Sequence, residues 1–191
     1  MKKIYMLFAT AALLSGCAST ATINRLETQN GQGVFHVVEQ RRSQSPAGFG
    51  DLQVTLNLKT RNPGSVLIDT TGYGTEKYQL LIGVNGQTQR VTGAMKQEVG
   101  EYRGSMDPEA GNGTRYRFAT TLRLPIGPHQ VTFALPVDGV VLEHEVIVGQ
   151  GANAIELKPV YRAKGNHRLL GFHGDRTFYG GVKTLIAAKQ C

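Results

Sequence analysis

The residues best suited to chemistry lie near the C-terminal end of the chain. His167, His173 and Asp175 fall within nine residues of one another, among glycines and aromatic residues. A histidine and a carboxylate at this spacing could form a general base with its orienting group, or supply two metal ligands. The chain contains no GxSxG or HExxH sequence and no paired cysteines to complete such a site. We therefore expect a structural role for these three residues and keep a hydrolase that uses them as the alternative.

Three further histidines stand alone in the sequence. His144 falls on the apolar face of a predicted strand, which is typical of a core or boundary position. His129 follows a Gly-Pro turn and is expected to cap it, and His36 has no candidate partner residue around it. We therefore expect no metal site and no cofactor.

Cysteine occurs twice, and the first one follows an apolar run. Lys2 and Lys3 open the chain, and the eleven residues 4–14 are almost all apolar. As a helix, such a run spans about 16 Å, roughly half of a ~30 Å hydrocarbon core. This length predicts the apolar region of a signal peptide, and the small residues Ser15 and Gly16 are typical of a cleavage site.

The sequence Leu14-Ser15-Gly16-Cys17 resembles the lipobox of bacterial lipoproteins. In that family the cysteine sulfur receives a diacylglyceryl group, the signal peptide is cut just before it, and the new N-terminus is usually acylated. The resemblance implies a signal peptide over residues 1–16 and a lipid-anchored Cys17 as the first residue of the mature protein. Cys191 would then have no intrachain partner, so we expect it to be unpaired or to bond to another molecule.

The residues after Cys17 bear on the membrane to which the protein is anchored. In the lipoprotein family an aspartate directly after the cysteine commonly retains the protein at the inner membrane, whereas this chain has Ala18 and Ser19. The resemblance therefore implies the periplasmic face of an outer membrane, with the inner membrane or the cell surface as alternatives.

The formal net charge of +7 is concentrated at the C-terminal end. Lys2 and Lys3 contribute +2, residues 17–160 hold 13 basic and 13 acidic residues, and residues 161–191 hold six basic residues against Asp175, which leaves +5. We expect residues 161–191 to be a basic tail, whose end could fold back as a last strand. The candidate contacts to an anionic partner are Arg162, Lys164, Arg168 and Arg176.

The compartment narrows the partners that this tail could have. Anionic lipid, a cell-wall polymer or an acidic surface on an envelope protein would each attract it, at about 1 kcal/mol per basic residue near an anionic membrane. A basic segment with interleaved aromatics is also typical of nucleic-acid binding, but exported lipoproteins rarely meet DNA or RNA. We therefore expect a membrane or envelope partner and no nucleic acid.

The elements that must position these residues are strands. Residues 51–60 alternate strictly, residues 78–93 form a hairpin pattern around Asn85-Gly86, and residues 115–161 contain further alternating runs separated by turns. Residues 17–32 are polar and aperiodic, which indicates a flexible tether to the lipid. The pattern predicts an all-β fold, an antiparallel immunoglobulin-like β-sandwich over residues 33–160, with no amphipathic helix of useful length.

The second half of this region is similar to the end of PEGA-type and other immunoglobulin-like envelope modules. Leu124, Pro125, Gly127 and His129 match their turn, although the four-residue signature that names the PEGA family is missing. The resemblance implies a binding or scaffolding module within a larger cell-envelope assembly.

Overall fold

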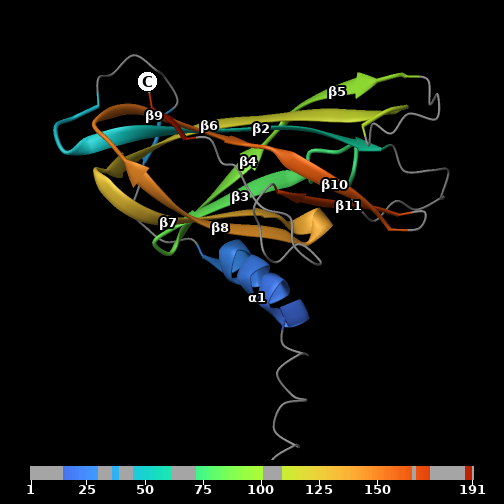
Figure 1. Cartoon of the computed structure of the whole chain (residues 1–191), viewed down its shortest axis with the longest axis horizontal. Coiled ribbons are helices and arrows are strands. Elements are labelled where there is room, and N and C mark those ends of the chain that lie inside the picture. The colour runs from blue at the N-terminus through green and yellow to red at the C-terminus, as the bar shows by residue number, and fades with distance from the viewer. Residues whose placement is uncertain are drawn as a thin grey trace, which may run out of the picture.

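The computed structural model describes residues 15–29, 36–38, 45–61, 72–100, 109–164, 167–172 and 188–190. Within these ranges the chain forms two sheets packed face to face, a separate two-stranded hairpin and a helix (Figure 1). The predicted all-β sandwich is confirmed.

The strands divide between the sheets as follows. In the described residues the six-stranded sheet contains β1 (His36–Val37), β2 (Phe49–Arg61), β5 (Ala94–Glu98), β6 (Gly113–Pro125), β9 (Gly151–Leu157) and β12 (Ala188–Gln190). The four-stranded sheet contains β3 (Gln79–Val84), β4 (Gln87–Thr92), β7 (Gly127–Leu135) and β8 (Val140–Val148). A 3-10 helix, η2 (Pro136–Asp138), joins β7 to β8, while β10 (Pro159–Lys164) and β11 (His167–Phe172) form the separate hairpin.

The order of strands shows which segments come together. The six-stranded sheet runs β1-β6-β2-β9-β12, with β5 also paired to β6, and the four-stranded sheet runs β4-β3-β7-β8. All of these pairs are antiparallel except β2 with β9, which run parallel from Gly50↔Gly151 to Leu56↔Leu157. The six-stranded sheet therefore joins an early strand of the chain, β2, to a late one, β9.

The alternation in the sequence sets the two faces of each strand. Leu52, Val54, Leu56 and Leu58 of β2 are all buried between the sheets, and the residues between them form the outer face. At the tip of the β3–β4 hairpin, Asn85 and Gly86 both have positive φ angles, 48° and 85°. These angles are those of the type I′ turn that favours Asn-Gly.

An aromatic group fills the core at the end of the sandwich where η2 lies. Tyr78, Tyr116 and Phe118 are fully buried, with ring centroids 4.7 to 6.1 Å apart. The hydroxyls of Tyr78 and Tyr73 donate to the two carboxylate oxygens of Asp138, at 2.5 and 2.7 Å. Asp138 therefore ties η2 to the segment that precedes β3.

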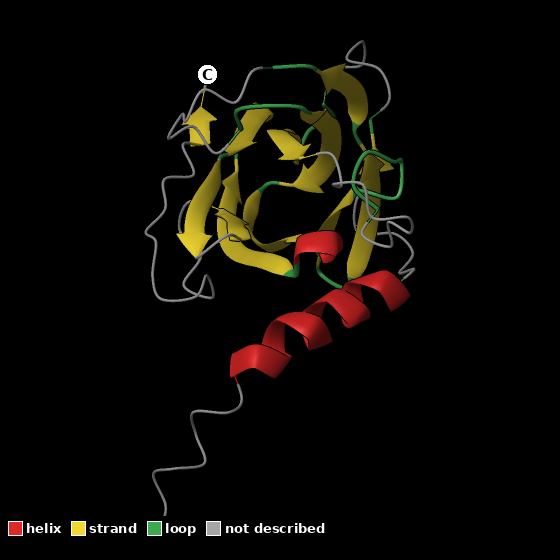
Figure 2. Ribbon diagram, turned by 90° about the vertical axis from the view of Figure 1, so that its right-hand side faces the viewer, coloured by secondary structure: helices red, strands yellow, loops and turns green. Residues whose placement is uncertain are grey.

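The N-terminal segment differs from the sequence prediction. Residues 17–32 were expected to be a flexible tether, but α1 (Ser15–Thr28) is a helix. It packs on the outer face of the four-stranded sheet (Figure 2). The tether prediction is wrong over residues 17–28, because Ile23 and Leu26, three residues apart, are buried against the sheet.

Other boundaries also shift. Within the predicted sandwich region, residues 33–160, the first described strand is β1 (His36–Val37), and β5 is a strand between the predicted hairpin and the alternating runs from residue 115. The alternating run at residues 153–161 divides into β9, in the six-stranded sheet, and β10, in the hairpin. At the end of the chain, β12 pairs with β9 from Ala188↔Ile155 to Gln190↔Asn153.

Candidate functional site

Cys17, the candidate lipidation site, is the third residue of α1. The N-terminal end of α1 projects away from the sandwich, whereas its C-terminal half lies against the four-stranded sheet (Figures 1 and 2). The cysteine that would carry the lipid therefore lies on a helix that is attached to the domain.

The contact between α1 and the sheet is a second apolar cluster, separate from the core between the sheets. It consists of Ile23 and Leu26 from the helix and Leu81, Ala134 and Val141 from β3, β7 and β8, all of them buried. These three strand residues belong to the outer face of the four-stranded sheet, since their neighbours along each strand are in the main core. β3 is thus buried on both faces.

The fit of the helix depends on Gly83 in β3. A Cβ atom at this glycine would lie 2.4 Å from Cδ2 of Leu26, so the absence of a side chain makes room for the leucine. At the C-terminal end of α1, Nη2 of Arg90 in β4 donates to the carbonyl oxygen of Glu27 at 2.8 Å. Because the last carbonyls of a helix have no partner within it, this bond both caps α1 and ties it to the sheet.

The first part of the expected basic tail is a β-hairpin. Arg162 and Lys164 belong to β10 and Arg168 to β11, whose register pairs Arg162 with Leu169 and Lys164 with His167. Opposite residues of a ribbon share a face, so 162, 164 and 167 occupy one face by register and Arg168 the other. The expected boundary at residue 161 is therefore displaced, because the hairpin starts at Pro159.

The candidate catalytic residues are only partly within the described chain. His167 begins β11, while His173, Asp175 and the fourth candidate contact, Arg176, lie outside the described residues. The described residues thus bring together three of the four basic candidates, in one hairpin, and one of the three candidate catalytic residues.

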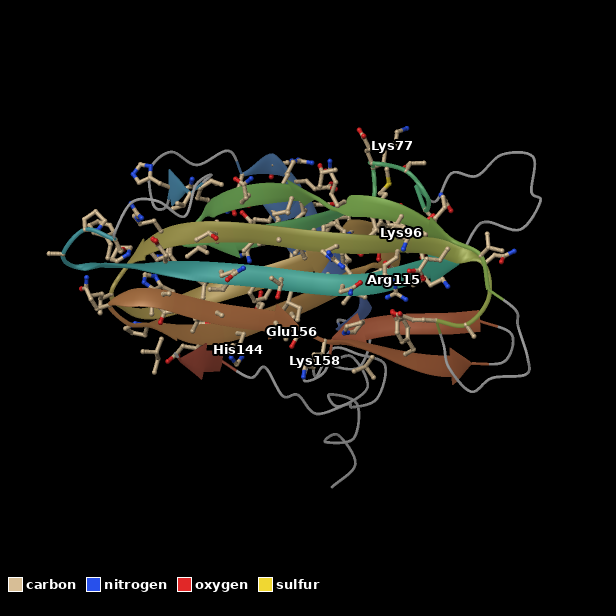
Figure 3. The ribbon with its side chains drawn as sticks, turned by 90° about the horizontal axis from the view of Figure 1, so that it is seen from above. Lys77, Lys96, Arg115, His144, Glu156 and Lys158 are labelled. Carbon is tan, nitrogen blue, oxygen red and sulfur yellow. The ribbon has the colours of Figure 1, made fainter. Side chains whose placement is uncertain are left out.

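An ionic cluster that the sequence did not reveal lies where the hairpin meets the sandwich. Nζ of Lys59 lies 2.7 Å from the carbonyl oxygen of Gly111 and 3.3 Å from Glu98. Arg115 bonds to Glu98 at 2.8 Å and to Glu109 at 2.9 Å. Figure 3 shows Arg115 at the same end of the molecule as β10 and β11.

Glu109 connects this cluster to the hairpin. One of its carboxylate oxygens accepts a bond from the backbone N–H of Lys59 at 3.1 Å and another from the hydroxyl of Tyr161 in β10. The pairing of β2 with β9 ends at Leu56. Glu109 therefore supplies a hydrogen-bond acceptor for the Lys59 N–H, which lies past the last β9 residue that pairs with β2. The ring of Tyr161 also packs against the main core, so β10 is fastened by an apolar and a polar contact.

The charges of the cluster stabilise one another. The hydrogen bond from Arg115 lowers the pKa of Glu98, and the same bond raises the pKa of Arg115. Two cations face two carboxylates, so the group is close to neutral. A nearly neutral cluster of ion pairs is typical of a structural contact, and this one connects β2, β5, β6 and β10. In the sequence Lys59 occupies a solvent-facing position of an alternating strand, so no pattern indicated this structural contact.

The isolated histidines occupy structural positions. Nε2 of His129 lies 2.8 Å from the carbonyl oxygen of Pro125, which is the expected cap of the turn. His144 is half-buried in β8 opposite Val131, and His36 is exposed in β1. Among the described residues no group of three or more histidine, cysteine, aspartate or glutamate side chains could hold a metal ion.

Comparison with known proteins gives no further guide. No family model, curated protein or solved structure matches the chain. Among the described residues, no helix is both long enough and apolar enough to cross a membrane.

Proposed function

We propose that this protein is a membrane-tethered lipoprotein of the bacterial cell envelope whose β-sandwich is a binding or scaffolding module within a larger assembly. The observation that carries the proposal is the sequence Leu14-Ser15-Gly16-Cys17 at the end of a short apolar run that follows Lys2 and Lys3. A cysteine in this setting is a substrate for lipid attachment. Helix α1 continues directly from Cys17 to Thr28.

Lipid attachment at Cys17 would give firm membrane binding. Each buried methylene contributes about 0.8 kcal/mol, so one acyl chain anchors marginally and two or more hold firmly. The absence of an aspartate at position 18 favours the periplasmic face of the outer membrane as the location.

The basic hairpin supports a binding role beyond the anchor. Arg162, Lys164 and Arg168 belong to the β10–β11 hairpin, and Tyr161 of the same hairpin bonds to Glu109 of the sandwich. An anionic lipid headgroup, a cell-wall polymer or an acidic protein surface is the class of partner that such charges attract.

The central test is the replacement of Cys17. We expect Cys17→Ser to abolish incorporation of labelled fatty acid and to move the protein from the membrane to the released fraction. Cys191→Ser is the matched control, because it removes the other cysteine and should leave labelling and membrane fractionation unchanged. Continued acyl labelling of the Cys17→Ser protein would exclude the lipoprotein proposal.

A further inference from the structure

We infer that α1 is a docked anchor arm that fixes the orientation of the sandwich on the bilayer, with the outer face of the four-stranded sheet toward the lipid. This inference rests on the proposed lipid at Cys17. It goes beyond that proposal because a lipid anchor by itself permits any orientation when a flexible segment follows it.

The first step is the length of the arm. Cys17 precedes Ile23 by six residues and Leu26 by nine, and the whole interval is helical. At 1.5 Å per residue, the anchored cysteine is about 9 Å from the first docked side chain and about 14 Å from the second along the helix axis. A flexible chain of the same nine residues could extend to about 30 Å. The helix therefore limits the distance between the lipid-bearing cysteine and the sandwich to about 14 Å.

The second step is the strength of the docking. Leu26 is 3% exposed and Ile23 7% exposed, and they contact three different strands of the four-stranded sheet. The bond from Arg90 to Glu27 fixes the C-terminal end of the arm, and Arg25 lies 3.9 Å from Glu143 of β8. The apolar contacts hold the helix on the sheet, and the bond from Arg90 ties its C-terminal end to β4.

The third step is the direction in which each sheet faces. The helix covers the outer face of the four-stranded sheet, and its N-terminal end leads away from that face (Figures 1 and 2). A bilayer that holds the lipid of Cys17 therefore lies on this side of the molecule. The six-stranded sheet is on the far side of the core, so its outer face, with Asn57, Arg117 and Ala119 exposed, is turned away from the membrane. That face is the one available to partners at a distance from the bilayer.

Two measurements on the mature lipidated protein in supported bilayers test the inference. Hydrogen exchange reports whether the α1 amides are protected, and neutron reflectometry reports the distance between the headgroups and the protein layer. We expect protected α1 amides and a protein layer that begins within about 15 Å of the headgroups.

Variants at the contact provide the contrast. Leu26→Asp places a carboxylate in the apolar cluster, and Gly83→Ala introduces a Cβ into the space of Leu26. Both should raise exchange in α1 about tenfold or more while the β2 and β6 amides stay protected. Both variants should also increase the distance between the headgroups and the protein layer in neutron reflectometry. Asn24→Asp changes an exposed residue of the same helix and should leave both measurements unchanged. Combining Leu26→Ala with Gly83→Ala should restore part of the protection, since the small side chain removes the clash.

The outcomes separate the inference from the proposed function. Unprotected α1 amides in the wild type, or an equally wide gap in wild type and Leu26→Asp, would overturn the anchor arm. The Cys17→Ser protein should keep protected α1 amides without any lipid, since docking needs only residues 23–27 and the sheet. A wild-type protein that carries no lipid but has protected α1 amides would exclude the proposed function alone. A lipidated wild-type protein with unprotected α1 amides would exclude the arm alone.

Discussion

At the residue scale, Tyr78 is the group whose chemistry the fold changes most clearly. It is fully buried, and its hydroxyl donates to Asp138 at 2.5 Å. Burial raises the pKa of Tyr78 well above 10, and the charge of Asp138 raises it further. Burial also raises the pKa of Tyr116, whose hydroxyl donates to the carbonyl oxygen of Thr75 at 3.0 Å.

These pKa shifts predict a loss of stability in alkali. The unfolded chain releases tyrosine protons near pH 10, whereas folded Tyr78 keeps its proton to higher pH, so the unfolded state is favoured as the pH rises above about 10. Each such proton lowers the free energy of unfolding by up to about 1.4 kcal/mol per pH unit. Denaturant titrations between pH 9 and 11 should show this fall in the wild type and a shallower fall in Tyr78→Phe.

Glu76→Ala is a suitable control for that experiment, because Glu76 is an exposed carboxylate in the same segment. It should reproduce the wild-type dependence on pH. A Tyr78→Phe protein with the full wild-type slope would mean that Tyr78 does not titrate abnormally.

At the element scale, β2 is the central strand of the six-stranded sheet. It pairs with β6 along its whole length and with β9 over its first part, and four of its leucine and valine side chains lie in the core. Its alternation was readable from the sequence, because each residue's face follows from its position alone. The same pattern could not show that β9 would run parallel to β2, since that pairing depends on the path of the intervening chain.

The assignment of the two faces of β2 is open to a direct test. Leu56 is 1% exposed, so Leu56→Asp buries an unpaired carboxylate and should lower the free energy of unfolding by several kcal/mol. Asn57→Asp puts the same carboxylate on the exposed neighbour and should change the free energy by much less. Equal melting temperatures for Leu56→Asp and the wild type would mean that the faces are inverted.

At the scale of the whole molecule, the distribution of charge is the main feature that bears on partners. Residues 161–191 carry all of the basic excess of the chain after residue 16, and the described part of that segment is the β10–β11 hairpin and β12. An electrostatic attraction to an anionic partner should therefore depend on this segment more than on the body of the sandwich.

A charge exchange with a matched control tests this. Replacing Arg162, Lys164, Arg168 and Arg176 by glutamine removes four of the six basic residues of the segment. We expect weaker binding to anionic vesicles and a smaller dependence on salt, because the lost attraction is screened Coulomb attraction. The fold should survive, since Tyr161 and Glu109 still fasten the hairpin.

The control removes the same number of charges elsewhere. Glutamine at Lys77, Lys96, Arg117 and Lys158, which are exposed residues outside the tail, gives an equal change in net charge (Figure 3 labels the three lysines). This protein should bind and respond to salt nearly as the wild type does. Equal losses in the two variants would show that net charge alone, and not the tail, determines binding.

Local sequence patterns predict the features that depend on short stretches of chain. The β-sandwich, the inner face of β2, the Asn85-Gly86 turn and the His129 cap follow from alternation and turn chemistry, which act over a few residues. The lipobox-like sequence at Cys17 is local in the same way, and its lipidation remains a prediction.

How distant segments meet follows from contacts that only the three-dimensional fold shows. The polar segment at residues 17–28 becomes a docked helix because Gly83, some sixty residues later in the chain, leaves space for Leu26. The basic tail begins as a fastened hairpin because Tyr161 of β10 reaches Glu109 beside β2. In both cases the stabilising contact joins residues far apart in the sequence, and no periodicity within either segment encodes the partner.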